Sequence, residues 1–178
     1  MLRAAFFTLV GVLFFVHWIT TQPSYGVSAS QSEWNYVLAF SAAILALAIA
    51  LPMFARLVGG RYTMRVSLVP AAGAALASFA NVLEDGLQLG WAFYAFILGT
   101  AMIDLGLIAL ALAIAFGSRG GHRLLALIPA GTLAAITFYV VGGGILMLAT
   151  WLAAAVVALV LPARGTTSAT PTQTPKLA

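Results

Sequence analysis

Long apolar stretches follow one another through this chain, and Asp104 is the one acidic residue that lies deep inside a stretch. The sequence is 63% hydrophobic and 7% charged, whereas a soluble domain carries about 25% charged residues. Too few charges are present to build a surface that faces water. The stretches also lack the alternation of barrel strands. We therefore predict an all-α, polytopic integral membrane bundle.

The number of membrane crossings follows from the length of these stretches. About 20 apolar residues span the hydrocarbon core as a helix. With breaks at polar or glycine-rich links, the sequence predicts one domain, residues 1–162, of six transmembrane helices. The Thr/Pro/Ala-rich residues 163–178 are expected to form a disordered cytoplasmic tail. The helices are expected at residues 4–20, 35–57, 66–83, 91–116, 124–140 and 145–161.

The basic residues give the chain an orientation. When the six helices alternate in direction from Arg3, all eight Lys and Arg residues fall on one side. Glu33, Glu84 and Asp85 fall on the other side. Because basic residues stay on the cytoplasmic side, both termini are predicted to be cytoplasmic, in a multi-pass protein of the cell membrane.

One alternative concerns the first helix. Arg3, the apolar run after it and the small residues 27–29 also resemble a secretory signal with a cleavage site. Cleavage would leave five helices with the same inside charges. The polar stretch before Ala29 is long for a signal, so we favour a retained helix.

Three of the four acidic residues lie between residues 73 and 106. At about 1.5 Å per helical residue, Glu84 and Asp85 lie at the outer membrane surface and Asp104 near the midplane. Asn81 and His17 fall between these depths. This gradient predicts an outward-facing polar cavity with Asp104 at or near its floor.

Asp104 is the residue whose position needs the most explanation. A charge at the bilayer centre costs about 2.5–3.5 kcal/mol on insertion scales. Burial without a cationic partner favours the neutral acid, which would donate a hydrogen bond to a backbone carbonyl or to Thr100. A purely structural hydrogen bond between helices is the alternative to a binding role. The candidate binding residues are Asp104, Asn81, His17, Glu84, Asp85 and Thr100.

Further patterns among the acidic, aromatic and small residues have ordinary explanations. Adjacent residues on a helix diverge by about 100°, so Glu84 and Asp85 are best explained as solvated topology markers. A carboxylate pair that admits a cation or amine is the alternative. The outer tyrosines and tryptophans fit an aromatic belt. Gly73, Ala77 and Asn81 share a helix face, which we expect to pack closely on Gly99 and Gly106 of the next helix.

Several chemistries are not expected from these residues. The chain has no cysteine, and its two histidines, His17 and His122, fall on opposite sides of the membrane. We therefore predict no metal site and no cofactor. The only lysine is Lys176, in the tail, so a Schiff base inside the bundle is excluded. The basic residues are scattered between helices, and nucleic acid is not an expected partner.

Three functions remain open from the sequence, and no catalytic residue is assigned. The first is binding or transport of a small solute, cation or proton, with the lipid bilayer as surroundings. The second is an accessory subunit that binds another membrane protein or a second copy. An enzyme acting on a lipid or isoprenoid ranks last; it would use Asp104 with His17, or Glu84 with Asp85, as acid and base.

Overall fold

The computed structural model describes residues 1–22, 33–118 and 120–161, and all regular structure in these ranges is helical. The predicted tail and the candidate cleavage site lie outside the described residues. The α-helices are α1 (Leu2–Thr21), α2 (Trp34–Val58), α3 (Arg61–Asn81), α4 (Ala92–Gly117), α5 (Leu127–Thr137) and α6 (Gly143–Val160). Three short turns join them: a π turn η2 (Val82–Gly86) and the 3₁₀ turns η3 (Gly120–Ala126) and η4 (Tyr139–Val141).

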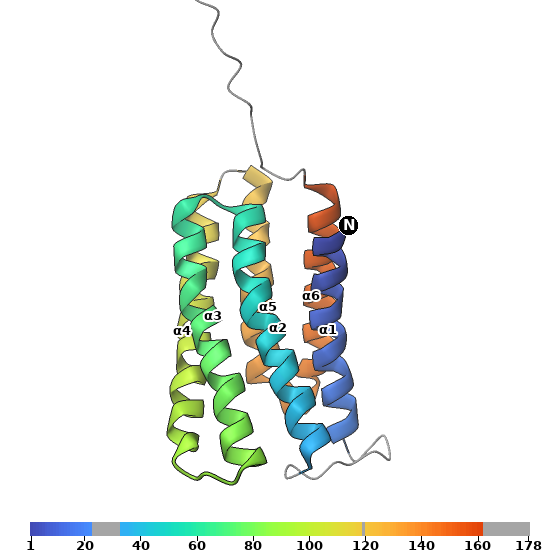
Figure 1. Cartoon of the computed structure of the whole chain (residues 1–178). Coiled ribbons are helices and arrows are strands. Elements are labelled where there is room, and N and C mark those ends of the chain that lie inside the picture. The colour runs from blue at the N-terminus through green and yellow to red at the C-terminus, as the bar shows by residue number, and fades with distance from the viewer. Residues whose placement is uncertain (23–32, 119, 162–178) are drawn as a thin grey trace, which may run out of the picture.

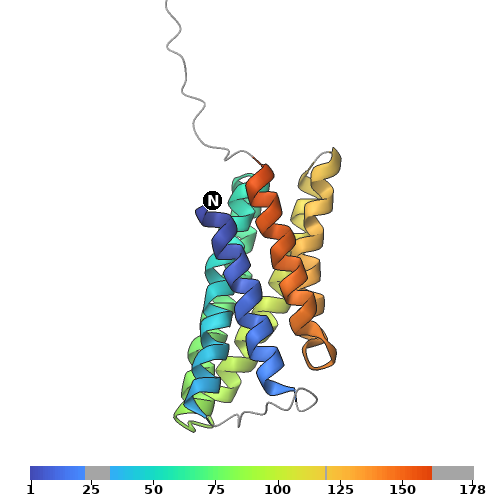
Figure 2. The ribbon, with the colours of Figure 1, turned by 90° about the vertical axis from the view of Figure 1, so that its right-hand side faces the viewer.

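The helices run up and down in chain order and form a ring (Figure 1). Each α-helix packs against its neighbours in the chain, and α6 returns to pack along α1. Figure 2, a view from the side of Figure 1, shows α1 and α6 next to each other. The short links explain this order, because consecutive helices joined by a few residues must lie antiparallel.

In the described part of the chain, five helices are long and apolar enough to cross a membrane: α1, α2, α3 with its π turn, α4 and α6. Large apolar side chains such as Phe79, Leu105 and Val141 lie exposed on the outside of the ring. An apolar exterior of this kind is suited to lipid rather than water.

The fifth predicted helix differs from expectation. In place of one α-helix over residues 124–140, η3 leads into α5, whose α-helical part has 11 residues. Pro129 lies in the first turn of α5, where its missing N–H leaves no bond unmade. The other bounds agree within a few residues, except that α3 begins at Arg61 and only Gly59 and Gly60 separate it from α2.

The two ends of the ring carry opposite charges. Following the chain direction in Figure 1, the described basic residues lie at the end that holds the N-terminus. Glu33, Glu84 and Asp85 lie at the opposite end, which we call the outer end.

Aromatic side chains close the half of the ring nearer the N-terminus. Phe7, Phe54 and Trp151 are fully buried, and they bring α1, α2 and α6 together. The ring centroids of Phe7 and Trp151 are 5.4 Å apart, and those of Phe7 and Phe54 are 6.2 Å apart. The cavities described below lie in the outer half of the ring.

Candidate functional site

A pocket of about 520 Å³ opens among the helix ends at the outer end of the ring. It gathers four residues that the sequence singled out: His17, Asn81, Glu84 and Asp85. Five aromatic side chains complete most of its wall. No Lys or Arg lines it within the described part of the chain. The aromatic residues are Tyr36, Phe40, Phe93, Phe96 and Tyr139.

The π turn η2 brings both carboxylates to the pocket. Its wider coil is closed by a bond from the Leu87 N–H to the Val82 carbonyl, five residues back, at 3.0 Å. Glu84 and Asp85 both belong to this turn, and both line the wall of the pocket. Few proteins contain π turns, and the π turns that do occur are often found at functional sites.

The end of the π turn is held by backbone and packing. Gln88 adopts a left-handed φ of 56°, and its side-chain Nε2 donates to the Asp85 carbonyl at 2.6 Å. Gly86 lies against the Trp34 ring, so that a methyl group there would be 2.9 Å from the indole. Glu84 and Asp85 form the part of the pocket that we call the acidic wall. These contacts hold the acidic wall in place between α3 and the start of α2.

His17 also lines the pocket, with an exposed fraction of 3%. Its ring stacks on Phe40, with centroids 4.6 Å apart and planes inclined by 26°, and it also contacts Tyr36 at 4.6 Å. Its Nδ1 is hydrogen-bonded to the Tyr139 hydroxyl at 2.6 Å. Its Nε2 is buried without a hydrogen-bond partner among the described residues.

The Tyr139 hydroxyl decides which tautomer of His17 this arrangement holds. That hydroxyl donates its single proton to the Phe14 carbonyl at 3.0 Å. The proton on the short bond to His17 must then come from Nδ1. The unpartnered Nε2 therefore keeps its lone pair and is an acceptor.

Asn81 has a positioning role as well as a place in the wall. Its Nδ2 donates to the Ser41 hydroxyl at 3.0 Å and to the Val37 carbonyl at 3.3 Å. Ser78 donates to the Ser41 carbonyl at 2.8 Å. Together these buried bonds clamp α3 to α2 beneath the acidic wall.

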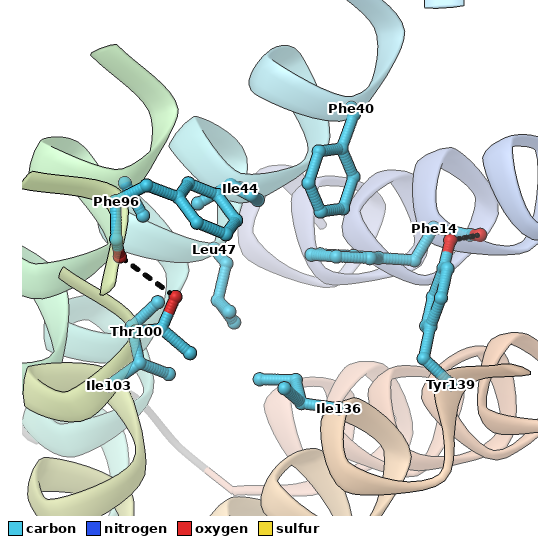
Figure 3. A pocket seen from close by; sticks show the side chains of 10 residues that line it. Phe14, Phe40, Ile44, Leu47, Phe96, Thr100, Ile103, Ile136 and Tyr139 are labelled. Carbon is cyan, nitrogen blue, oxygen red and sulfur yellow. Dashed lines mark hydrogen bonds between the residues drawn. The ribbon is translucent and has the colours of Figure 1, made fainter. Parts of the chain in front are cut away.

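A second cavity of about 160 Å³ lies at the centre of the ring (Figure 3). We call it the inner chamber. It shares three aromatic residues, Phe40, Phe96 and Tyr139, with the outer pocket. Its other lining residues are Phe14, Ile44, Leu47, Ala77, Thr100, Ile103 and Ile136.

Thr100 and Asp104, two of the predicted binding residues, lie apart from the acidic wall. Thr100 lines the inner chamber, but its hydroxyl donates to the Phe96 carbonyl of its own helix at 3.0 Å (Figure 3). Asp104 lines neither cavity; it is half-buried, and its Oδ1 has no hydrogen-bond partner within the described ranges. The floor on which the sequence placed Asp104 is instead formed by aromatic rings above an apolar chamber.

The aromatic wall was missed by sequence reasoning, which assigned the outer aromatic residues to a membrane belt. A helical spacing signal was present. Tyr36, Phe40 and Ile44 follow one another at four-residue intervals on α2, and so share one face. Phe96, Thr100 and Ile103 follow at intervals of four and three residues on α4, and both faces turn toward the ring centre.

The arrangement favours a positively charged ligand that donates hydrogen bonds. Two carboxylates and several aromatic faces present negative potential to the same space. Among the described residues no group of three or more His, Asp or Glu side chains is placed to hold a metal ion. Comparisons with family models, with curated proteins and with solved structures find no match to this chain.

Proposed function

We propose that this chain is a six-crossing protein of the cell membrane with both termini in the cytoplasm. The segment made of η3 and α5 supports the sixth crossing. At about 2.0 Å per 3₁₀ residue and 1.5 Å per α-helical residue, it reaches about 30 Å, the thickness of a hydrocarbon core. The separation of basic and acidic residues between the two ends supports the orientation.

At the outer end, the proposed function is binding of a small organic cation, namely a protonated amine. One observation carries this proposal: Glu84, Asp85 and His17 line a pocket with five aromatic rings and no described Lys or Arg. An ammonium group over an aromatic face gains about 0.5–2 kcal/mol. Hydrogen bonds between charged groups contribute about 1.5–3 kcal/mol more.

The packing of α3 bears on the accessory-subunit alternative. That role would be favoured by a small-residue face left open for a partner. The face of α3 that carries Gly73 and Ala77 is covered by α4, with Gly73 against Gly99. The cation-binding function needs no partner on this face.

The binding test uses the full chain in lipid nanodiscs and protonated methylamine as the probe, measured by saturation-transfer NMR and calorimetry. Replacing Glu84 by Gln and Asp85 by Asn together is expected to weaken binding at least about tenfold, or about 1.4 kcal/mol. Glu33→Gln is the matched control, because Glu33 is an exposed carboxylate at the same end outside the pocket. Absence of methylamine binding, or equal binding in both variants, would overturn the function.

The topology has its own test, because the chain contains no cysteine. Gly90 and Gly117 both have open space where a side chain would be added, and they lie at opposite ends of the ring. In intact cells a membrane-impermeant maleimide should label the Gly90→Cys variant at once. It should label Gly117→Cys only after permeabilisation. The reverse pattern contradicts the proposed orientation.

A further inference from the structure

The inner chamber offers a ligand no free polar group among its described lining residues. The Thr100 hydroxyl is bonded within α4, and the Tyr139 hydroxyl is bonded to Phe14 and His17. Every other side chain that lines the chamber is a hydrocarbon. Water in such a space would find no partners, so an apolar group is the favoured occupant.

The size of the chamber limits that occupant. An engineered apolar cavity of about 150 Å³ is known to stay dry and to bind benzene or xenon. The inner chamber, at about 160 Å³, has room for one phenyl ring or a branched alkyl group of similar bulk. It is too small for the two acyl chains of a membrane lipid.

The chamber and the outer pocket meet at one set of side chains. Phe40, Phe96 and Tyr139 line both cavities, so the aromatic floor of the outer pocket is also the rim of the chamber. Figure 3 shows Phe40, Phe96 and Tyr139 around the space into which Ile136 and Leu47 also point. The two cavities therefore adjoin, which is the arrangement that a single molecule with a charged head and an apolar group requires.

We propose that the ligand is an aralkyl or branched-alkyl amine with its ammonium group in the outer pocket and its apolar group in the inner chamber. This inference rests on the proposed function, because the outer pocket must hold the ammonium group. It adds the substrate class: amines with one apolar substituent of about phenyl size. Polyamines are disfavoured, because a second charge would enter a chamber without acceptors.

Three probes test the two cavities independently. Methylamine carries the ammonium head alone, toluene carries the ring alone, and 2-phenylethylamine carries both. Burial of the ring should make 2-phenylethylamine bind about 10- to 100-fold more tightly than methylamine. If methylamine binds and 2-phenylethylamine binds no better, this inference is wrong while the proposed function stands. If toluene binds but neither amine does, the chamber exists and the proposed function fails with the inference.

Substitutions at Ile136 test the chamber directly, since this partly buried residue lines it and its side chain can be made larger or smaller. Ile136→Phe should weaken binding of 2-phenylethylamine at least tenfold and leave methylamine unchanged. Ile136→Ala should shift the preference toward the bulkier 2-(1-naphthyl)ethylamine. Ile108→Phe, on the exposed side of α4, is the matched control and should change neither probe. Equal responses to the three substitutions would overturn the inference, and the paired changes at one position keep the test valid if one variant folds poorly.

Discussion

The seam between α3 and α4 and the outer half of the ring are built in opposite ways. At the seam, glycines bring two backbones into contact: a methyl group on Gly99 would lie 2.7 Å from the Ala77 nitrogen. One on Gly106 would lie 2.5 Å from the Pro70 ring. Across the ring, large side chains such as Phe40 and Phe96 line the two cavities and leave space between the helices.

This difference separates stability from binding within one small bundle. Without a hydrophobic driving force between helices in lipid, close backbone packing is a main source of association. The seam supplies that packing along α3 and α4, and the Asn81 clamp extends it to α2. The cavities leave part of the interior unfilled, which a bundle tolerates only when it is held together elsewhere.

The largest effect is expected from breaking the seam. Gly99→Ala places a methyl group against the backbone of Ala77, which has no flexible side chain to move away. Overpacking of this kind costs about 1–3 kcal/mol, and the rigid neighbour puts Gly99 at the upper end of that range. Thermal unfolding of the purified chain in detergent measures the loss.

Gly117→Ala is the control for this prediction, because a methyl group there meets nothing within 4 Å. Its stability should change by less than about 0.5 kcal/mol. If Gly99→Ala and Gly117→Ala unfold at the same temperature, the seam is not the stabilising element that the comparison requires.

The seam is also the part of the structure that the sequence predicted best. The short link between the two helices predicted that α3 lies against α4, and the small residues Gly73, Ala77, Gly99 and Gly106 were expected to let the two backbones approach closely. The helix bounds were predictable for a similar reason, because length and polarity decide where a crossing begins and ends.

The site was harder to predict because depth along a helix says nothing about direction around it. Counting residues placed Asp104 at the right height for a cavity floor, but Ile103 and Thr100 are the α4 residues that face the chamber. The π turn was equally hidden, since one extra residue in a turn leaves no mark in composition. The presence of Glu84, Asp85 and His17 in one pocket depends on the packing of α1 on α2 and of α2 on α3.

A smaller effect is expected at the bond that orients His17. Tyr139→Phe removes the hydroxyl shared by His17 Nδ1 and the Phe14 carbonyl, and it leaves both atoms without that partner. Stability should fall by about 1–2 kcal/mol. Methylamine binding should weaken about three- to tenfold, because the His17 ring is no longer held in its place in the pocket wall.

Tyr94→Phe provides the comparison for Tyr139→Phe. Tyr94 is a highly exposed tyrosine near the same end of the ring, and it does not line the pocket. Its loss of a hydroxyl should alter neither unfolding temperature nor methylamine binding. Equal binding losses in the two variants would show that His17 is not held for the ligand.

The smallest effect is expected at Asp104, the residue that sequence reasoning placed in the site. Asp104 lines neither the outer pocket nor the inner chamber, and a neutral acid in the bilayer is close in shape and polarity to an amide. Asp104→Asn should therefore bind methylamine and 2-phenylethylamine within about twofold of the unaltered chain, with stability changed by less than about 0.5 kcal/mol. Calorimetry on the same nanodisc preparations measures both affinities. A loss of binding comparable to that of the Glu84 and Asp85 variant would mean that Asp104 acts on the bound ammonium group from outside the two cavities. The division between a packed seam and an open site would then not hold, because a residue that lines neither cavity would contribute to binding.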